Sequence, residues 1–299
     1  MPRGGARKLI AMARRRLLLV AALALAVAAC AGVWRRGPYH GTTERIAYGP
    51  AASNVAELRV PAGPGPHPVV VMLHGGYYQR RYGADYFVPL AEALTTEGFA
   101  TWNVEYRRLG EDGAGYPGTF RDVADATDLL SRLAPTRHLD LGHVTALGHS
   151  AGGQLALWLA SGSRLRFAPS DAPVRIARVV ALAPVTDLRG IANVEKGMVR
   201  EVMGGPPSER SERYAELSPL ELVPLGVPQV VIHGTDDWLL PFAASERYVA
   251  AAHAKGDDVT LVPIRGMGHL AVADPSSAVW PHLLAAVRGD AQPAGDSRS

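Results

Sequence analysis

The amino-acid sequence predicts an α/β fold, with a mostly parallel central sheet and helices on both of its faces. Short apolar runs rich in valine alternate with stretches of helical periodicity through most of the 299 residues. Several runs, such as PVVVML at residues 68–73, are apolar at every position, as strands buried on both faces are. Strand and helix alternating in this way are typical of one parallel sheet with crossover helices.

The predicted elements follow one another in chain order. Strands are predicted at residues 67–76, 100–107, 143–149, 177–187, 228–237 and 258–266. Helices are predicted at residues 86–98, at 119–133, directly after Ser150, from Pro241 onward and at about 275–288. Thr119 and Asp122 suggest a capping box at the start of the second helix. The Gly-, Pro- and charge-rich residues 188–225 interrupt the alternation as an excursion from the sheet.

One catalytic domain is predicted, at residues 45–288, because no second block of core-forming residues occurs. The polar residues 289–299 are predicted to be a disordered tail. The formal net charge of +3 comes from the start of the chain, where six basic residues and no acid precede residue 30. Removing them leaves 3 − 6 = −3, so the basic balance indicates a targeting segment and no nucleic-acid partner is expected.

Residues 1–29 have the parts of an export signal: a basic start, an apolar run from Leu17, and small residues at its end. The apolar run is short for a membrane-spanning helix. Cys30, the only cysteine, follows directly and resembles the cysteine of a bacterial lipobox, which becomes lipid-modified. A buried core cysteine is the alternative. We expect residues 30–44 to be a lipidated cysteine and tether that anchor an exported protein to the cell membrane.

A tight turn carries Ser150 in the segment GHSAGG, residues 148–153, between a predicted strand and a helix. Glycines two positions before and two after the serine suit a turn in which a nearby Cβ would clash. A serine on such a turn is held up and exposed, as a nucleophile must be. The alternative is an ordinary strand-to-helix turn with an N-cap serine.

A serine hydroxyl needs a neighbouring base and an acid that orients the base. In this type of sheet the reactive groups gather at the carboxyl ends of the strands. Asp236 and Asp237 end one later predicted strand, and His269 follows the next. The order serine, acid, histidine therefore supports a Ser-His-Asp catalytic site.

Four motifs together resemble the α/β-hydrolase fold, in its esterase, lipase and prolyl-oligopeptidase-like group. They are LHGGYY, GHSAGG, HGTDDWLLP and GMGHL, which occur in that order and resemble the oxyanion loop, nucleophile elbow, acid loop and histidine loop. The resemblance covers about residues 45–288. The first loop is also similar to that of kynurenine formamidases, although Tyr78 stands where their loop carries tryptophan.

The resemblance implies that Ser150 is the nucleophile and His269 the general base. The family's His-Gly-x-x-Asp pattern selects Asp237 as the orienting acid. Asp236 and Asp187, which closes an earlier strand, remain alternatives.

The negative oxygen of a tetrahedral intermediate must be met by backbone N–H groups. We expect one from Ala151, directly after the nucleophile, and the other from Gly76 or Tyr77 in the first loop. His74 is expected to have a structural role there, as a histidine that binds the backbone. Trp238 and the excursion at residues 188–225 are expected to line or cover a substrate cleft, whereas Trp102 and Trp158 are expected in the core.

The predicted function is hydrolysis of carboxylic esters through an acyl-enzyme intermediate. The substrate is expected to be a small ester or a short peptide or amide. An exopeptidase, amidase or formamidase on the same fold is the alternative within enzymes, and a non-catalytic binding lipoprotein is the alternative outside them. The sequence contains no metal-binding cluster and no dinucleotide fingerprint, and the chemistry requires neither metal nor cofactor.

Overall fold

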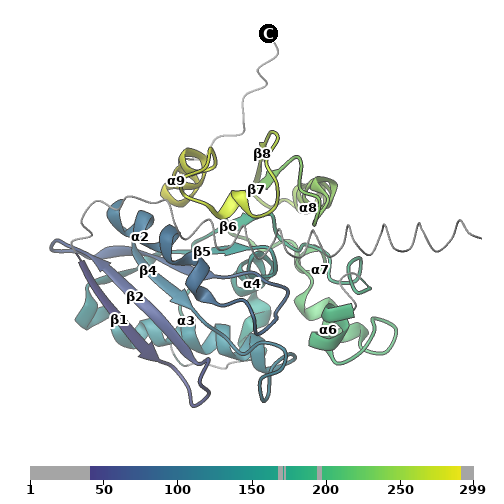
Figure 1. Ribbon diagram of the computed structural model, residues 1–299, viewed down its shortest axis with the longest axis horizontal. Coiled ribbons are helices and arrows are strands. Elements are labelled where there is room, and N and C mark those ends of the chain that lie inside the picture. The colour runs from purple at the N-terminus through teal and green to yellow at the C-terminus, as the bar shows by residue number, and fades with distance from the viewer. Residues whose placement is uncertain (1–40, 168–170, 172, 194–196, 291–299) are drawn as a thin grey trace, which may run out of the picture. The chain divides into compact units, whose positions relative to one another are not determined.

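A computed structural model of the chain describes residues 41–167, 171, 173–193 and 197–290 (Figure 1). Its strands are β1 (Gly41–Ala47), β2 (Val55–Pro61), β3 (His67–Leu73), β4 (Ala100–Val104), β5 (Leu139–His149), β6 (Arg178–Leu182), β7 (Gln229–Gly234) and β8 (Val259–Ile264). Its α-helices are α2 (Val88–Thr96), α3 (Gly118–Arg137), α4 (Ala151–Ala160), α5 (Met198–Met203), α6 (Ser211–Leu217), α7 (Pro219–Leu222), α8 (Phe242–Ala254) and α9 (Trp280–Arg288).

The strands form one sheet with the order β1-β2-β4-β3-β5-β6-β7-β8. The pairs β1–β2 and β2–β4 are antiparallel, and every other neighbouring pair is parallel. Figure 1 shows helices on both sides of this sheet, with α2 and α9 on one side and α3 on the other. The predicted α/β fold with a mostly parallel sheet is confirmed.

The central strand β3 shows how the sequence builds two cores. Because side chains alternate along a strand, Val69 and Val71 point to one face while Val70 and Met72 point to the other. The first face packs in the core that α3, α4 and α8 share, and the second packs against α2 and α9. All four side chains are fully buried. The uninterrupted apolar run is therefore the mark of a strand covered on both sides.

The tryptophans expected in the core lie there. Trp102 and Trp158 are fully buried, in β4 and α4 respectively. The Trp102 indole N–H donates to the carbonyl of Ala126 in α3, over 2.8 Å. Trp102 therefore joins the sheet to α3, and Trp158 packs edge-on against Phe120 of α3 and against Phe167.

The amino-terminal edge of the folded domain differs from the prediction. The tether was predicted to run to residue 44, but residues 41–44 belong to β1, where Gly41 pairs with Pro61 and Glu44 with Leu58. This strand is mostly exposed, so it carries no apolar alternation from which it could be predicted. It is held in place by pairing with β2, and the Arg137 guanidinium donates to Glu44 over 2.8 and 2.9 Å.

The predicted capping box at Thr119 and Asp122 is wrong. Helix α3 begins at Gly118, and no side chain caps its first turn. The Thr119 hydroxyl instead donates to the carbonyl of Arg107 over 2.6 Å, and Asp122 accepts from the Arg107 guanidinium over 2.8 and 2.6 Å. The Thr119 hydroxyl also accepts from the backbone N–H of Gly115 over 2.9 Å, so Thr119 lies inside the first turn and does not occupy the N-cap position.

The excursion predicted at residues 188–225 contains the short helices α5, α6 and α7. Buried Gln154 fastens it to helix α4, because the Gln154 amide donates to the carbonyl of Leu217 over 2.7 Å. The same Gln154 accepts from the hydroxyl of Tyr78 over 2.7 Å. One side chain therefore ties the excursion to the loop that follows β3.

The predicted export signal, Cys30 and most of the predicted tether and tail lie outside the described residues. Gly289 and Asp290, the first two residues of the predicted tail, close the end of α9 by donating to the carbonyl of Ala285. Within the described ranges, no helix has both the length and the apolar character needed to cross a membrane.

Candidate active site

The topology places three predicted site residues at the same edge of the sheet. Ser150 follows β5, Asp237 follows β7 and His269 follows β8. These strands are parallel, so their carboxyl ends meet at one edge, where open α/β sheets bind their ligands. Ser150, Asp237 and His269 are all buried in the structure.

Ser150 occupies a strained backbone conformation between β5 and α4. Its φ of 57° and ψ of −118° are sparsely populated for a residue with a side chain. The neighbouring glycines allow the turn, because a Cβ on Gly148 would lie 2.0 Å from the carbonyl oxygen of Gly152. A Cβ on Gly152 would lie 2.0 Å from the carbonyl oxygen of Leu73. Glycine is therefore required at positions 148 and 152, because the surrounding backbone leaves no room for a side chain at either position.

Asp237 and His269 are joined by a short hydrogen bond. The His269 ring donates from Nδ1 to Asp237 Oδ2 over 2.6 Å. With its proton on Nδ1, the neutral ring has an unprotonated Nε2 that can accept a proton from a serine. No hydrogen bond joins His269 to the Ser150 hydroxyl in the part of the chain that the structure describes. Such a bond often tightens only when substrate is present.

Four hydrogen bonds satisfy the Asp237 carboxylate. Oδ1 accepts from the backbone N–H groups of Leu239 and Leu240, over 2.8 and 2.9 Å. Oδ2 accepts from His269 and also from Nε2 of His233, over 2.9 Å. Burial acts to raise the pKa of Asp237, but the donors from His233 and His269 outweigh it and hold the pKa well below its ordinary value. Asp237 is therefore an anion that can stabilise a protonated His269.

The two alternative acids lie elsewhere. Asp236 is exposed and accepts from the hydroxyl of Thr235 over 3.0 Å. Asp187 accepts from the backbone N–H of Gly190 over 3.0 Å, in a surface turn. The structure therefore brings Asp237, and neither alternative, to His269.

His233 is a site residue that the sequence analysis missed. It is fully buried, and its Nδ1 accepts from the Ser245 hydroxyl over 2.7 Å while Nε2 donates to Asp237. It lies at the end of a strand, where an apolar residue would fill the same space. The sequence feature that could have identified His233 is its position in the segment HGTDD, four residues before Asp237.

The loop after β3 contains the predicted oxyanion donors Gly76 and Tyr77. Both have positive φ, 106° and 54° respectively. A Cβ on Gly76 would lie 2.4 Å from the Cβ of Tyr82, so only glycine fits there. Ala151, the third predicted donor, is the first residue of α4, where a backbone N–H has no partner within the helix.

His74 fixes the direction of this loop. Its Nδ1 donates to the carbonyl of Gly75 over 2.8 Å. Carbonyl and N–H point in opposite directions across a trans peptide, so this bond aims the N–H of Gly76 away from His74. The hydroxyl of Tyr106 donates to the carbonyl of His74 over 2.6 Å, and the Tyr106 ring stacks on the His74 ring at 4.2 Å. His74 thus has the predicted role of binding the backbone.

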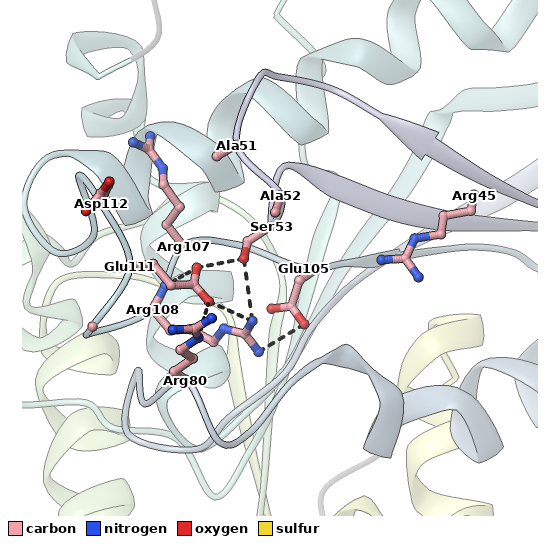
Figure 2. Close-up of a pocket in the computed structure, with 11 residues that line it drawn as sticks. Arg45, Ala51, Ala52, Ser53, Arg80, Glu105, Arg107, Arg108, Glu111 and Asp112 are labelled. Atoms are coloured by element: carbon pink, nitrogen blue, oxygen red, sulfur yellow. Dashed lines mark hydrogen bonds and ion pairs between the residues drawn. The ribbon is translucent and has the colours of Figure 1, made fainter.

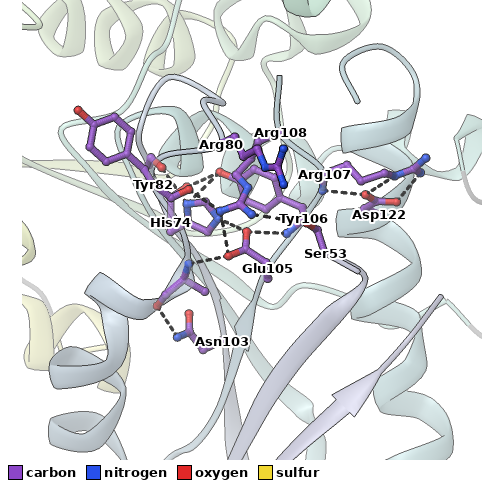
Figure 3. A network of polar contacts seen from close by, with 12 residues as sticks. Ser53, His74, Arg80, Tyr82, Asn103, Glu105, Tyr106, Arg107, Arg108 and Asp122 are labelled. Carbon is purple, nitrogen blue, oxygen red and sulfur yellow. Dashed lines mark hydrogen bonds and ion pairs between the residues drawn. The ribbon is translucent and has the colours of Figure 1, made fainter. Parts of the chain in front are cut away.

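An ion-pair network lies behind His74 (Figure 3). Glu105 accepts from Nε2 of His74 over 2.9 Å and from the Arg108 guanidinium over 3.1 Å. Arg108 also donates to the carbonyl of Tyr82 over 2.6 Å. Burial acts to raise the pKa of Glu105, but His74 and Arg108 together lower it, so the carboxylate stays charged. The network thus holds His74, near the start of the predicted oxyanion loop, and Tyr82, four residues beyond its end.

A polar groove of about 670 Å³ adjoins this network (Figure 2). Arg108 pairs with Glu105 and Glu111 across it, and Ser53 donates to Glu111 over 2.6 Å. Ser150, Asp237 and His269 do not line this groove. Many of the charged side chains that line the groove already have partners within the protein. We therefore interpret these side chains as supporting the predicted oxyanion loop, and we do not assign the groove a ligand.

Trp238, directly after Asp237, is the one large apolar side chain that is exposed among the described residues, at 60%. Its place beside the acid fits the expected role at a substrate cleft, which stays a prediction. The described ranges contain no group of three or more His, Cys, Asp or Glu side chains that could hold a metal ion.

The sheet topology, together with similarity to known esterases, defines a serine hydrolase of the α/β-hydrolase fold. A family model described as BD-FAE matches residues 58–251, more than half of the chain. The protein therefore belongs to the BD-FAE family.

Curated relatives cover the same region. The chain is 26% identical over 274 residues to the probable isoprenylcysteine alpha-carbonyl methylesterase ICME of Oryza sativa subsp. japonica, covering 84% of this chain and 64% of that protein. It is 26% identical over 202 residues to the acylamino-acid-releasing enzyme of Homo sapiens, covering 65% of this chain and 27% of that protein. The chain thus spans less than two thirds of each relative's length.

Solved esterase structures share the fold. Esterase B from Lactobacillus rhamnosis superposes with a TM-score of 0.74 at 21% identity, covering 93% of this chain and 94% of that one. A truncated carbohydrate esterase from gut microbiota has a TM-score of 0.72 at 16% identity, covering 85% and 99%. The similarity to kynurenine formamidases stays a prediction from the loop sequence.

Proposed function

We propose that the protein hydrolyses carboxylic esters through an acyl-enzyme on Ser150, with His269 as general base and Asp237 as the orienting acid. The hydrogen bond from His269 to Asp237, at the sheet edge that carries the strained Ser150, is the observation that carries the proposal. Membership of the BD-FAE family and similarity to a methylesterase support ester substrates.

The first half of the reaction acylates Ser150. As its Oγ attacks the ester carbonyl carbon, Nε2 of His269 takes the hydroxyl proton and Asp237 stabilises the resulting imidazolium. The carbonyl oxygen becomes an oxyanion that accepts from the N–H of Ala151 and from Gly76 or Tyr77. The intermediate then expels the alcohol, which receives the proton from His269.

The second half hydrolyses the acyl-enzyme. His269 takes a proton from water, whose oxygen attacks the acyl carbon and forms a second oxyanion in the same place. Collapse of this intermediate releases the carboxylic acid and returns the proton to Ser150. The cycle uses only groups of this chain and water.

A single substitution tests the proposal. Ser150→Ala removes the nucleophile, while the turn depends on glycines and makes no use of the hydroxyl in packing. We expect hydrolysis of p-nitrophenyl esters to fall by several orders of magnitude, to about 10⁶-fold. A fluorophosphonate probe should label the parent and leave Ser150→Ala unlabelled. Hydrolysis by Ser150→Ala at a tenth of the parent rate would refute the assignment.

Amide hydrolysis is a second candidate, because similarity to the acylamino-acid-releasing enzyme of Homo sapiens favours it. The same three residues can cleave amides, with His269 protonating the leaving amine. Matched p-nitrophenyl esters and p-nitroanilides with the same acyl group separate the two. We expect kcat/KM to favour the ester, beyond its greater chemical reactivity. A preference for acylated amino-acid amides would assign the second activity.

We further propose that the protein is exported and tethered to the bacterial cell membrane through a lipid on Cys30. The support is the sequence alone: an apolar run that ends in VAAC at residues 27–30. One acyl chain binds a bilayer only marginally, so a stable anchor needs two or more. The residues after Cys30 would then let the catalytic domain stand clear of the bilayer.

Mass spectrometry of the mature amino terminus tests the tether. We expect a diacylglyceryl group on Cys30 in protein extracted from membranes. Cys30→Ser removes the modified thiol and leaves the apolar run intact, so it should shift the protein from the membrane fraction. An unmodified Cys30 in membrane-extracted protein would exclude the lipid anchor.

A further inference from the structure

Three hydrogen bonds connect the predicted oxyanion loop with the histidine loop. The backbone N–H of Gly75 donates to the Tyr86 hydroxyl over 2.5 Å. The Tyr86 hydroxyl lies 3.0 Å from Nδ1 of His149, and Nε2 of His149 lies 3.0 Å from the carbonyl oxygen of His269. These three bonds form a continuous hydrogen-bond chain from the backbone N–H of Gly75, beside Gly76, to the backbone carbonyl of His269.

The two ends of this chain determine the direction of every bond in it. Gly75 contributes an N–H, which can only donate, so the Tyr86 oxygen accepts and its proton is free for His149. His269 contributes a carbonyl, which can only accept, so His149 carries its proton on Nε2. Both requirements select the same neutral tautomer of His149, with Nδ1 as acceptor. All three bonds are therefore satisfied at once.

The protonation states of Tyr86 and His149 agree with these hydrogen-bond directions. Burial raises the pKa of Tyr86 well above its ordinary value, so the hydroxyl keeps its proton. Burial, with the nearby His269, lowers the pKa of His149 to about 3, so its ring stays neutral in ordinary buffers. The Tyr86 ring is also packed edge-on against two other rings: its centroid lies 6.3 Å from that of His74 and 4.8 Å from that of Phe87.

The connected groups lie around the nucleophile. His149 directly precedes Ser150, and its ring lies 4.7 Å from the ring of His269. A Cβ on Gly75 would lie 3.0 Å from the Cβ of Ser150, so this part of the loop packs directly against the serine. A shift at either end of the chain would therefore change the position of a reacting group.

We propose that Tyr86 and His149 are positioning residues that act as one unit, holding the predicted oxyanion loop and His269 in register around Ser150. The proposal rests on the proposed function, since it assigns these roles to the loop and to His269. Neither side chain exchanges a proton with substrate. Tyr86 and His149 instead position the groups that contact substrate. The predicted oxyanion loop and the histidine loop are positioned together because the same hydrogen-bond chain ends on both.

Tyr86→Phe and His149→Asn test the two links. Tyr86→Phe removes the hydroxyl and keeps the ring, whereas His149→Asn keeps an acceptor near the Nδ1 position and loses the donor to His269. A misplacement of this kind can lower a rate by about 100-fold. We expect each variant to lower kcat by about 10- to 100-fold on p-nitrophenyl acetate, with KM within about twofold of the parent. A purely structural role would lower the folded fraction and leave kcat per folded molecule unchanged.

Tyr248→Phe is the matched control. Its hydroxyl is also buried and donates to a side chain, Gln229 Oε1, over 2.5 Å. Gln229 begins β7, at the opposite end of that strand from Asp237. Tyr248→Phe should therefore lower the melting temperature and retain the parent kcat.

The double variant Tyr86→Phe/His149→Asn decides whether the residues act as one unit. If both belong to one chain, breaking a second link adds nothing, and kcat should match that of the worse single variant. Independent supports would instead multiply their losses, and that result overturns the proposal, as does a parental kcat in both single variants. Ser150→Ala is assayed beside them: if it stays active the proposed function fails, whereas if it is inactive only the positioning chain is under test.

Discussion

The Asp237 carboxylate accepts a hydrogen bond of 2.6 Å from His269, and the same oxygen accepts another from His233 over 2.9 Å. One acid thus accepts from two buried imidazoles, and that of His233 is wholly enclosed. The enclosed ring keeps the carboxylate in place and helps to keep it charged, which is the state that stabilises a protonated His269.

Asp237→Asn should lower kcat by about 10⁴-fold, whereas Asp236→Asn should leave it within about twofold. An amide cannot stabilise the imidazolium, and it can hold His269 in the wrong tautomer. Asp236 is the control because it is adjacent and exposed, and its carboxylate accepts from the Thr235 hydroxyl instead of from a histidine. Steady-state kinetics on p-nitrophenyl acetate provide the measurement. A greater loss in Asp187→Asn would move the acid to the earlier strand.

His233→Leu should destabilise the fold by about 1.5–3 kcal/mol, the cost of a lost hydrogen bond to a charged group. His233→Gln places an amide N–H near the position of Nε2 and should recover part of that stability. Urea unfolding at pH 7.5 compares the three proteins. Equal stability of His233→Leu and the parent would show that the backbone donors of Leu239 and Leu240 suffice for Asp237.

Most of this site could be predicted from the sequence because its residues lie in short, continuous motifs. Glycines around Ser150 and the placement of Asp237 and His269 after successive strands are visible in the chain itself. His233 and Tyr86 were missed for a different reason. His233 stands in the segment HGTDD, four residues before Asp237, but its hydrogen bond to that carboxylate forms only in the folded chain. Tyr86 and its partner His149 are 63 residues apart, so no local pattern connects them.

The fold differs from the prediction at three points: strands β1 and β2, which were not predicted, and the capping box. Strand β1 is mostly exposed and held by pairing with β2, so no period of apolar residues announces it. Thr119 and Asp122 have the spacing of a capping box, but the helix begins before Thr119, and the Asp122 carboxylate pairs with the Arg107 guanidinium. Sequence patterns report burial and local bonds, and they are silent on polar partners distant along the chain.

Gly76→Ala should lower kcat by about 10²- to 10³-fold, the effect of losing one oxyanion donor. The new Cβ would overlap Tyr82 and the backbone has a φ of 106°, so the loop must shift. Gly110→Ala is the control, because Gly110 also has a positive φ, 90°, but open space around it. Both variants carry backbone strain, and only Gly76→Ala should lose kcat. Equal losses would mean that strain alone is responsible.

His149 should make the stability of the protein depend on pH between about 6.5 and 3. Its pKa falls from 6.5 to about 3 on folding, mainly by burial and also by the nearby charge of His269, with Asp237 opposing. Below pH 6.5 the unfolded chain therefore binds a proton that the folded chain excludes, and stability falls as the pH falls. Below about pH 3 both states are protonated and this contribution stops changing.

His149→Gln isolates that contribution, because glutamine does not titrate and its amide can still donate near the Nε2 position. We expect the free energy of unfolding of the parent to fall more steeply than that of the variant between pH 6.5 and 4.5. The difference in slope should approach about 1.4 kcal/mol per pH unit, the value for one proton. Urea unfolding at fixed ionic strength measures both slopes, and since every other titrating group is common to the two proteins, their difference belongs to residue 149. Parallel slopes would mean that His149 accepts a proton in the folded state, which would leave Tyr86 without an acceptor on that ring.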